Sequence, residues 1–173
     1  MADVNNSKLL NIHAGILPKD ACVVIVRTEW NADILDELER GCVETLRENG
    51  TSRILVINVP GAVEITFAIN SYWQTNRNTD AHPNAFIALG CVIQGDTPHF
   101  DYVCKSVTDG ITHLNITLPV PVIFGVLTVN TKQQAEERIG GIHGHKGKEA
   151  AITALKMISI ARSMSSLKPG NKS

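Results

Sequence analysis

The 173-residue chain contains 43% hydrophobic and 19% charged residues, which is typical of a single globular domain with a sizeable core. Its formal net charge of −1 argues against a nucleic-acid-binding protein, and no apolar run approaches the roughly 20 residues that cross a membrane. The start lacks the basic-then-apolar order of a secretory signal and the four cysteines show no paired spacing, so we expect a cytoplasmic protein with reduced thiols.

The first half of the chain contains two predicted strand–helix units. Residues 1–20 are polar and mixed, and we expect an N-terminal extension for which pairing with a neighbouring subunit is one option. The continuous apolar run at 21–26 is typical of a strand covered on both faces, and apolar positions spaced by three and four predict a helix over 31–49. A second buried strand is expected at 53–59, and a helix over 62–74 follows it.

The second half repeats this order. A third buried strand is expected at 86–93, and a helix with one apolar face covers 98–115. The fourth strand is expected at 122–127, after two prolines that end the preceding helix. A short helix over 132–138 then leads through a glycine-rich turn into the last helix, 148–164.

This alternation of strands and helices predicts an α/β protein with a doubly wound sheet. We expect a three-layer α/β/α sandwich of the flavodoxin-like type, built around a four-stranded parallel sheet. Residues 21–164 would form one catalytic domain, and the polar residues 165–173 a flexible tail. In such sheets, ligands bind outside the carboxyl ends of the strands.

The stretch Gly90–Asp101 carries the strongest local signal for a binding site. Thr97 is the predicted N-cap of the helix that follows, and Pro98 fits its first position. The free N–H groups of residues 95–97, at the positive end of that helix, form a seat for an anion such as phosphate. His99 lies beside the seat, where an imidazole can transfer a proton near neutral pH. A plain βα turn with a surface histidine is the alternative interpretation.

Five further residues have both a functional and a structural interpretation. Trp30 either stacks on a flat ring or is an aromatic at the edge of the core. Glu64 either accepts hydrogen bonds from hydroxyls or caps a helix, and Phe124 is a core residue by default. Arg138 and Lys146 are surface charges unless the end of the chain folds back on the phosphate seat.

Metal and nucleotide chemistry have little support in the sequence. His143 and His145 form an H-x-H pair, but no carboxylate or cysteine cluster accompanies them, so we expect no metal centre. The chain also lacks the glycine-rich and serine motifs of dinucleotide-binding proteins, P-loop proteins and serine hydrolases.

Four blocks in family-like order resemble lumazine synthase, the 6,7-dimethyl-8-ribityllumazine synthase of riboflavin biosynthesis. The resemblance covers roughly residues 20–162. The blocks are Trp30-Asn31, Pro60-Gly61-Ala62-Val63-Glu64-Ile65, Gly90 to Phe100, and Pro121 to Thr128 followed by Gln134 to Arg138 and Lys146 to Ala151.

This resemblance implies the reaction. A ribitylaminouracil condenses with 3,4-dihydroxy-2-butanone 4-phosphate by imine formation, loss of phosphate and ring closure with loss of water. It implies no metal and no organic cofactor. It also implies a homo-oligomer with active sites between subunits, either a pentamer or a shell of 60 subunits. A flavin- or lumazine-binding paralogue with little or no turnover, and a purely structural shell protein, are the alternatives.

The resemblance also assigns roles to residues. His99 would transfer protons, while Trp30 would cover the pyrimidine ring and Glu64 would accept from the ribityl hydroxyls. Phe124 and Arg138 would come from the neighbouring subunit. The implied uracil-binding residues are Trp30, Ala62, Val63, Glu64, Cys91, Val92, Ile93 and Phe124, and the implied phosphate-binding residues are Asp96, Thr97, Arg138 and Lys146.

Three positions depart from the family pattern near the implied phosphate site. Gln94 replaces a usual arginine and removes one positive charge. Asp96 places a carboxylate at the phosphate seat, so its side chain is expected to point away. His145 replaces a common asparagine.

Overall fold

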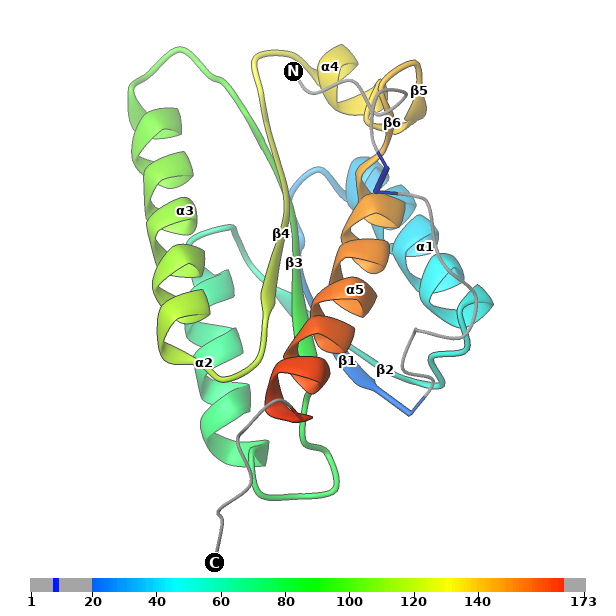
Figure 1. Ribbon diagram of the computed structural model, residues 1–173. Helices are drawn as coiled ribbons and strands as arrows, with labels where there is room; N and C mark the ends of the chain where they lie inside the picture. The colour runs from blue at the N-terminus through cyan, green and yellow to red at the C-terminus, as the bar shows by residue number, and fades with distance from the viewer. Residues whose placement is uncertain (1–7, 10–19, 167–173) are drawn as a thin grey trace, which may run out of the picture.

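A four-stranded parallel sheet forms the middle layer of the protein (Figure 1). The computed structural model describes residues 8–9 and 20–166. The elements, in chain order, are β1 Cys22–Thr28, α1 Ala32–Glu48, β2 Arg53–Val59, α2 Glu64–Asn76, β3 Ala85–Ile93, α3 His99–Thr117, β4 Val122–Val129, α4 Lys132–Glu136, β5 Ile139–Gly141, β6 Gly144–His145 and α5 Lys146–Ser166. The sheet has the order β2-β1-β3-β4, and all its strands are parallel.

Helices cover both faces of this sheet, as Figure 1 shows. α2 and α3 lie on one side and α1 and α5 on the other. Successive side chains of a strand point to opposite faces, so β1 contributes to two separate cores. Val23 and Ile25 pack in the core under α1 and α5, and Val24 and Val26 pack in the core under α2 and α3. The prediction of a three-layer, doubly wound α/β fold is confirmed.

The second predicted strand is present, but the prediction that it is buried on both faces is wrong. β2 pairs only with β1 and forms the edge of the sheet. Leu55 and Val56 in its middle are exposed. An apolar run therefore indicates the strand but does not give its place in the sheet, because strand order depends on partners distant in sequence.

The predicted start of α3 is also corrected. Thr97 is not the N-cap of α3, because Pro98 occupies that position and no side chain caps the helix. Asn31 is the N-cap residue of α1, but it has a left-handed backbone with a φ of 56° and its side chain makes no cap bond. The Asn31 side chain is thus available for another partner.

A small antiparallel hairpin, β5–β6, replaces the predicted glycine-rich turn before the last helix. Gly140 and Gly144 have φ values of 117° and 80°, a region that glycine enters without strain. α4 and this hairpin lie at the carboxyl end of the sheet, the upper end in Figure 1. The hairpin therefore brings residues 139–145 to the edge where ligands bind in such folds.

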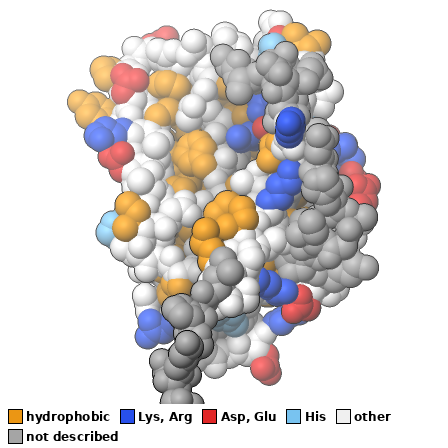
Figure 2. Space-filling model, viewed as in Figure 1, with side chains coloured by type: hydrophobic (Ala, Val, Ile, Leu, Met, Phe, Trp, Pro, Cys, Tyr) orange, Lys and Arg blue, Asp and Glu red, His pale blue; other side chains and the backbone are white. Residues whose placement is uncertain are grey.

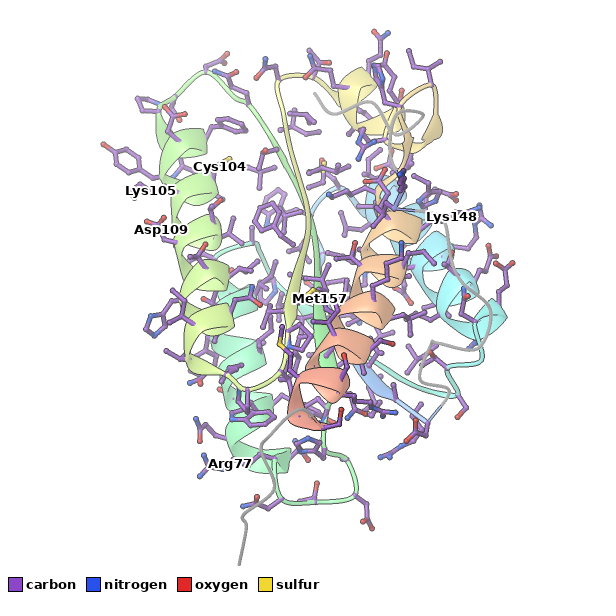
Figure 3. The ribbon with its side chains drawn as sticks, viewed as in Figure 1. Arg77, Cys104, Lys105, Asp109, Lys148 and Met157 are labelled. Carbon is purple, nitrogen blue, oxygen red and sulfur yellow. The ribbon has the colours of Figure 1, made fainter. Side chains whose placement is uncertain are left out.

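The outer surface of α3 is polar. Lys105 and Asp109 point away from the sheet in Figure 3, and Lys105 Nζ donates to Asp109 Oδ2 at 2.6 Å. Among the helices of the described residues, none combines the length and the hydropathy needed to span a membrane. The expected N-terminal extension and flexible tail lie largely outside the described residues.

Candidate functional site

A cavity of about 590 Å³ opens at the carboxyl ends of β1 and β3. The loops after β1 and β2 and the first turns of α2 and α3 complete its wall. Its lining residues are Thr28, Trp30, Asn31, Gly61, Ala62, Val63, Glu64, Cys91, Val92, Ile93, His99 and Val103. We call this the His99 cavity.

The strand pairing explains why a cavity opens at this point. β3 pairs with β1 only as far as Leu89, whereas its pairing with β4 continues to Ile93. The chain also leaves β1 toward β2 on one side and returns as β3 on the other, which is the arrangement that creates a crevice in doubly wound sheets. Backbone groups of residues 90–93 on the β1 side are therefore not used by the sheet.

Trp30 belongs to the wall of the cavity and not to the core. Its side chain is 72% exposed, which rules out the interpretation as a core-edge aromatic. Gly61 lies close to both Trp30 and Glu64. A Cβ on Gly61 would lie 2.9 Å from Glu64 Oε2 and 3.8 Å from the indole ring. The glycine thus leaves room for a carboxylate and an aromatic plane to stand next to each other.

Asn31 is a site residue that the sequence interpretation missed. Its Nδ2 donates to the Cys91 carbonyl at 3.0 Å and so ties the loop after β1 to the end of β3. The Cys91 carbonyl thus accepts a hydrogen bond from within the chain. Burial raises the pKa of the Cys91 thiol to about 11, so the thiol is protonated at neutral pH. Only the pairing of two segments 60 residues apart reveals this role.

His99 is the first residue of α3, and it lines the cavity with an exposed side chain. Asp96 and Thr97 are exposed residues of the loop that precedes it. They are not among the residues that line the His99 cavity. The predicted phosphate seat is therefore a neighbour of the cavity on the side of α3.

A second cavity of about 290 Å³ lies between β4 and α5, and Phe124, Lys146 and Glu149 line it. Phe124 is half-buried on β4 and packs against the core under α2 and α3, so its default interpretation as a core residue holds in part. Figure 2 shows hydrophobic side chains over β4, with Lys and Arg side chains toward α5. The second cavity thus combines an aromatic ring with charged groups.

A buried carboxylate holds two cations beside this cavity. Arg138 Nη2 donates to Glu149 Oε2 at 2.8 Å, and Arg138 Nη1 donates to the His143 carbonyl. Lys146 Nζ lies 3.9 Å from the same Glu149 oxygen, and burial lowers the pKa of Lys146. We call these three side chains the Arg138 cluster. Two cations and one carboxylate leave it with net positive charge, which suits an anionic ligand.

The predicted site residues therefore fall into separate groups within one chain. One group lines the His99 cavity, and another lines the second cavity, between β4 and α5. Arg138 is connected to the second cavity by its ion pair with Glu149. Glu149 was not predicted as a site residue, although it stands three positions after Lys146 on the same helix. The predicted H-x-H pair does not converge, because His143 lies near Glu137 and His145 near Glu37.

Within the described residues, no group of three or more His, Cys, Asp or Glu side chains is arranged to hold a metal ion. The chemistry that the two cavities offer is accordingly that of an aromatic plane, a carboxylate, an imidazole and a cation cluster.

Comparison with known proteins gives the family. The family model for 6,7-dimethyl-8-ribityllumazine synthase matches residues 20–162. The chain belongs to the lumazine synthase family. It is 52% identical over 146 residues to the 6,7-dimethyl-8-ribityllumazine synthase of Porphyromonas gingivalis, which covers 83% of this chain and 88% of the relative.

Two further relatives carry the same name. The protein of Bacteroides fragilis is 51% identical over 81% of this chain and 96% of its own length. That of Cytophaga hutchinsonii is 45% identical over 87% of this chain and 94% of its own length. The lumazine synthase match thus spans every residue that lines the His99 cavity, together with the Arg138 cluster.

Proposed function

We propose that this chain is a 6,7-dimethyl-8-ribityllumazine synthase of riboflavin biosynthesis. It condenses 5-amino-6-(D-ribitylamino)uracil with 3,4-dihydroxy-2-butanone 4-phosphate and releases phosphate and water. The observation that carries the proposal is the His99 cavity, where an aromatic plane, a carboxylate and an imidazole line one crevice in a chain of this family. The names of its relatives support the same reaction.

The uracil substrate would occupy the His99 cavity. Trp30 covers the pyrimidine ring, whose flat face matches the indole. The backbone of Val92 and Ile93 binds the pyrimidine edge, since these groups are not used by β1. Glu64 accepts hydrogen bonds from the ribityl hydroxyls beside Ala62 and Val63. The cavity is large enough for a ligand of this kind.

His99 is the proposed proton-transfer residue. Formation of an imine moves protons between the amine, the carbonyl oxygen and the departing water, and an imidazole exchanges protons readily near neutral pH. In the next step the phosphate leaves from C4, two carbons from the imine carbon, and it must be held until then. Backbone N–H groups of Asp96 and Thr97, in the loop that precedes α3, would bind it. Holding two substrates together accounts for much of the expected acceleration.

The active site is proposed to lie between two copies of the chain. Phe124, Arg138 and Lys146 do not line the His99 cavity of their own chain, so a neighbouring copy would supply them. Two exposed apolar side chains that line that cavity, Trp30 and Val63, favour coverage by another protein surface. A ring-shaped homo-oligomer satisfies this arrangement, with a pentamer and a 60-subunit shell as the two expected forms. The four free cysteines agree with the proposed cytoplasmic location.

The test is to mix the purified protein with both substrates and to record lumazine absorbance against the uncatalysed reaction. A rate above the uncatalysed one is expected. A matched variant, Arg138→Lys, keeps the positive charge but cannot form bidentate hydrogen bonds. It should raise the KM for the phosphate substrate more than the KM for the uracil. No product above the uncatalysed rate would reject the proposed function.

A further inference from the structure

His145 is a buried histidine at the junction of three elements. It ends β6, pairs with Ile139 of β5, and directly precedes α5. Only 9% of its surface is exposed, which is unusual for a polar residue next to a glycine-rich turn. Its imidazole is used neither in the His99 cavity nor in the Arg138 cluster.

The ring fills a space that two glycines keep open. A Cβ added at Gly41 of α1 would lie 2.2 Å from His145 Cε1. A Cβ added at Gly147 of α5 would lie 3.1 Å from the same atom and 2.1 Å from the Leu38 carbonyl oxygen. α1 and α5 therefore approach each other closely at this point, and the imidazole packs between them.

Both ring nitrogens have partners. Nδ1 accepts from the backbone N–H of Lys148 at 3.4 Å, so His145 caps the first turn of α5. Nε2 lies 3.4 Å from Glu37 Oε1 on α1. Figure 3 shows Lys148 at the start of α5, on the side of α1. The side chain thus links the start of α5 to the middle of α1.

The backbone that follows His145 connects to the Arg138 cluster. Lys146, the next residue, donates its N–H to the Arg138 carbonyl at 2.7 Å. The Arg138 guanidinium donates to the carbonyl of His143 in the same hairpin. A displacement of residue 145 would therefore move the backbone of both cations of the cluster, although its ring touches neither.

We propose that His145 is a positioning residue for the Arg138 cluster. By packing against Gly41 and capping α5, it holds the β5–β6 hairpin so that Arg138 and Lys146 face a common anion. This inference rests on the proposed function for the identity of that anion, the phosphate of the four-carbon substrate. The structural interpretation to be excluded is that His145 only stabilises the contact between α1 and α5.

Amide hydrogen exchange tests the inference without reference to catalysis. In His145→Ala, the amides of Lys146 and Lys148 should lose protection, while those of Ala154 and Leu155 in the middle of α5 should keep it. His145→Asn should retain protection at Lys148, because an asparagine side chain caps helices well. Loss of protection along the whole of α5 would show a general structural role and overturn the proposal.

Kinetics separate positioning from stability. His145→Ala should raise the KM for the phosphate substrate about tenfold, which is the size of effect expected from the loss of one helix-capping hydrogen bond. It should leave the KM for the uracil substrate unchanged. Gly41→Ala keeps His145 but displaces its ring, and it should likewise raise the KM for the phosphate substrate and not that for the uracil. His145→Asn should have KM values close to those of the wild type. His113→Asn, which removes an exposed imidazole from α3, should leave both KM values unchanged.

The outcomes are distinct. Equal increases in both KM values, or no change in either variant, would overturn the role of His145. A wild-type protein without synthase activity would reject the proposed function, and the exchange experiment would still decide whether His145 positions the cluster.

Discussion

The ion pair between Arg138 and Glu149 provides a quantitative test of the second half of the site. Both side chains are almost fully buried, with 10% and 11% of their surfaces exposed, and the pair is hydrogen-bonded at 2.8 Å. Among the described residues, Glu149 Oε1 has no hydrogen-bond partner. Removing Arg138 would therefore leave a buried carboxylate with only Lys146 nearby, at 3.9 Å.

The expected magnitude follows from this geometry. Breaking a buried ion pair by removal of one partner costs about 3–5 kcal/mol. Because Lys146 still partly compensates the charge of Glu149, we expect Arg138→Met to lower the free energy of unfolding by about 3 kcal/mol. For a chain of this length, that loss lowers the melting temperature by about 6–12 °C. Glu149→Leu should destabilise the protein similarly, because it leaves the arginine unpaired. The double variant replaces both charges with apolar groups and should lose less than the two single changes together.

The assay is thermal unfolding of the four proteins at one protomer concentration, since assembly makes the melting temperature depend on concentration. We expect a coupling free energy of about 2 kcal/mol or more between the two sites. Strictly additive single effects, with a coupling below about 0.5 kcal/mol, would show that the pair is not a unit and would refute the reasoning.

Three further predictions concern other parts of the molecule. Trp30→Ala should raise the KM for the uracil substrate with a stability change within about 0.5 kcal/mol, because the side chain is exposed; unfolding and kinetics of the same sample check this. Gly125→Ala should destabilise the protein by about 1–3 kcal/mol in denaturant titrations, since its Cβ would lie 2.7 Å from the Ala88 carbonyl oxygen, and wild-type stability would contradict the packing of β4 on β3. Burial lowers the pKa of His145, Glu37 opposes this effect, and Lys148 and Arg40 lower the pKa further. The unfolded chain therefore binds a proton at this histidine more readily, and the free energy of unfolding should fall as the pH drops below the unfolded-state pKa of about 6.5. His145→Asn should lose this part of the pH dependence.

The sequence predicted the layers of the fold because the local patterns were clear. Continuous apolar runs marked β1, β3 and β4, and helical spacing marked the helices between them. The edge position of β2 could not be predicted, because its apolar run resembles that of a central strand. The β5–β6 hairpin was hidden by its glycines, which indicate a turn without showing what pairs across it.

The His99 cavity was predictable for a topological reason. The carboxyl ends of parallel strands meet at one edge, so residues after β1, β2 and β3 had to lie near one another. The contributions of Asn31 and His145 were not predictable, because each depends on a partner far away in the sequence. Asn31 binds the Cys91 carbonyl, and His145 packs against Gly41.

The claim that two copies of the chain share one site is tested most directly by mixing subunits. His99→Ala and Arg138→Ala would be expressed together in equal amounts, and the assembled protein assayed for lumazine formation. Each variant alone should be slow. If neighbouring copies complete each site, random assembly restores about one quarter of the sites, because each half comes from the intact variant half of the time. Activity no greater than the mean of the two single variants would contradict the shared site.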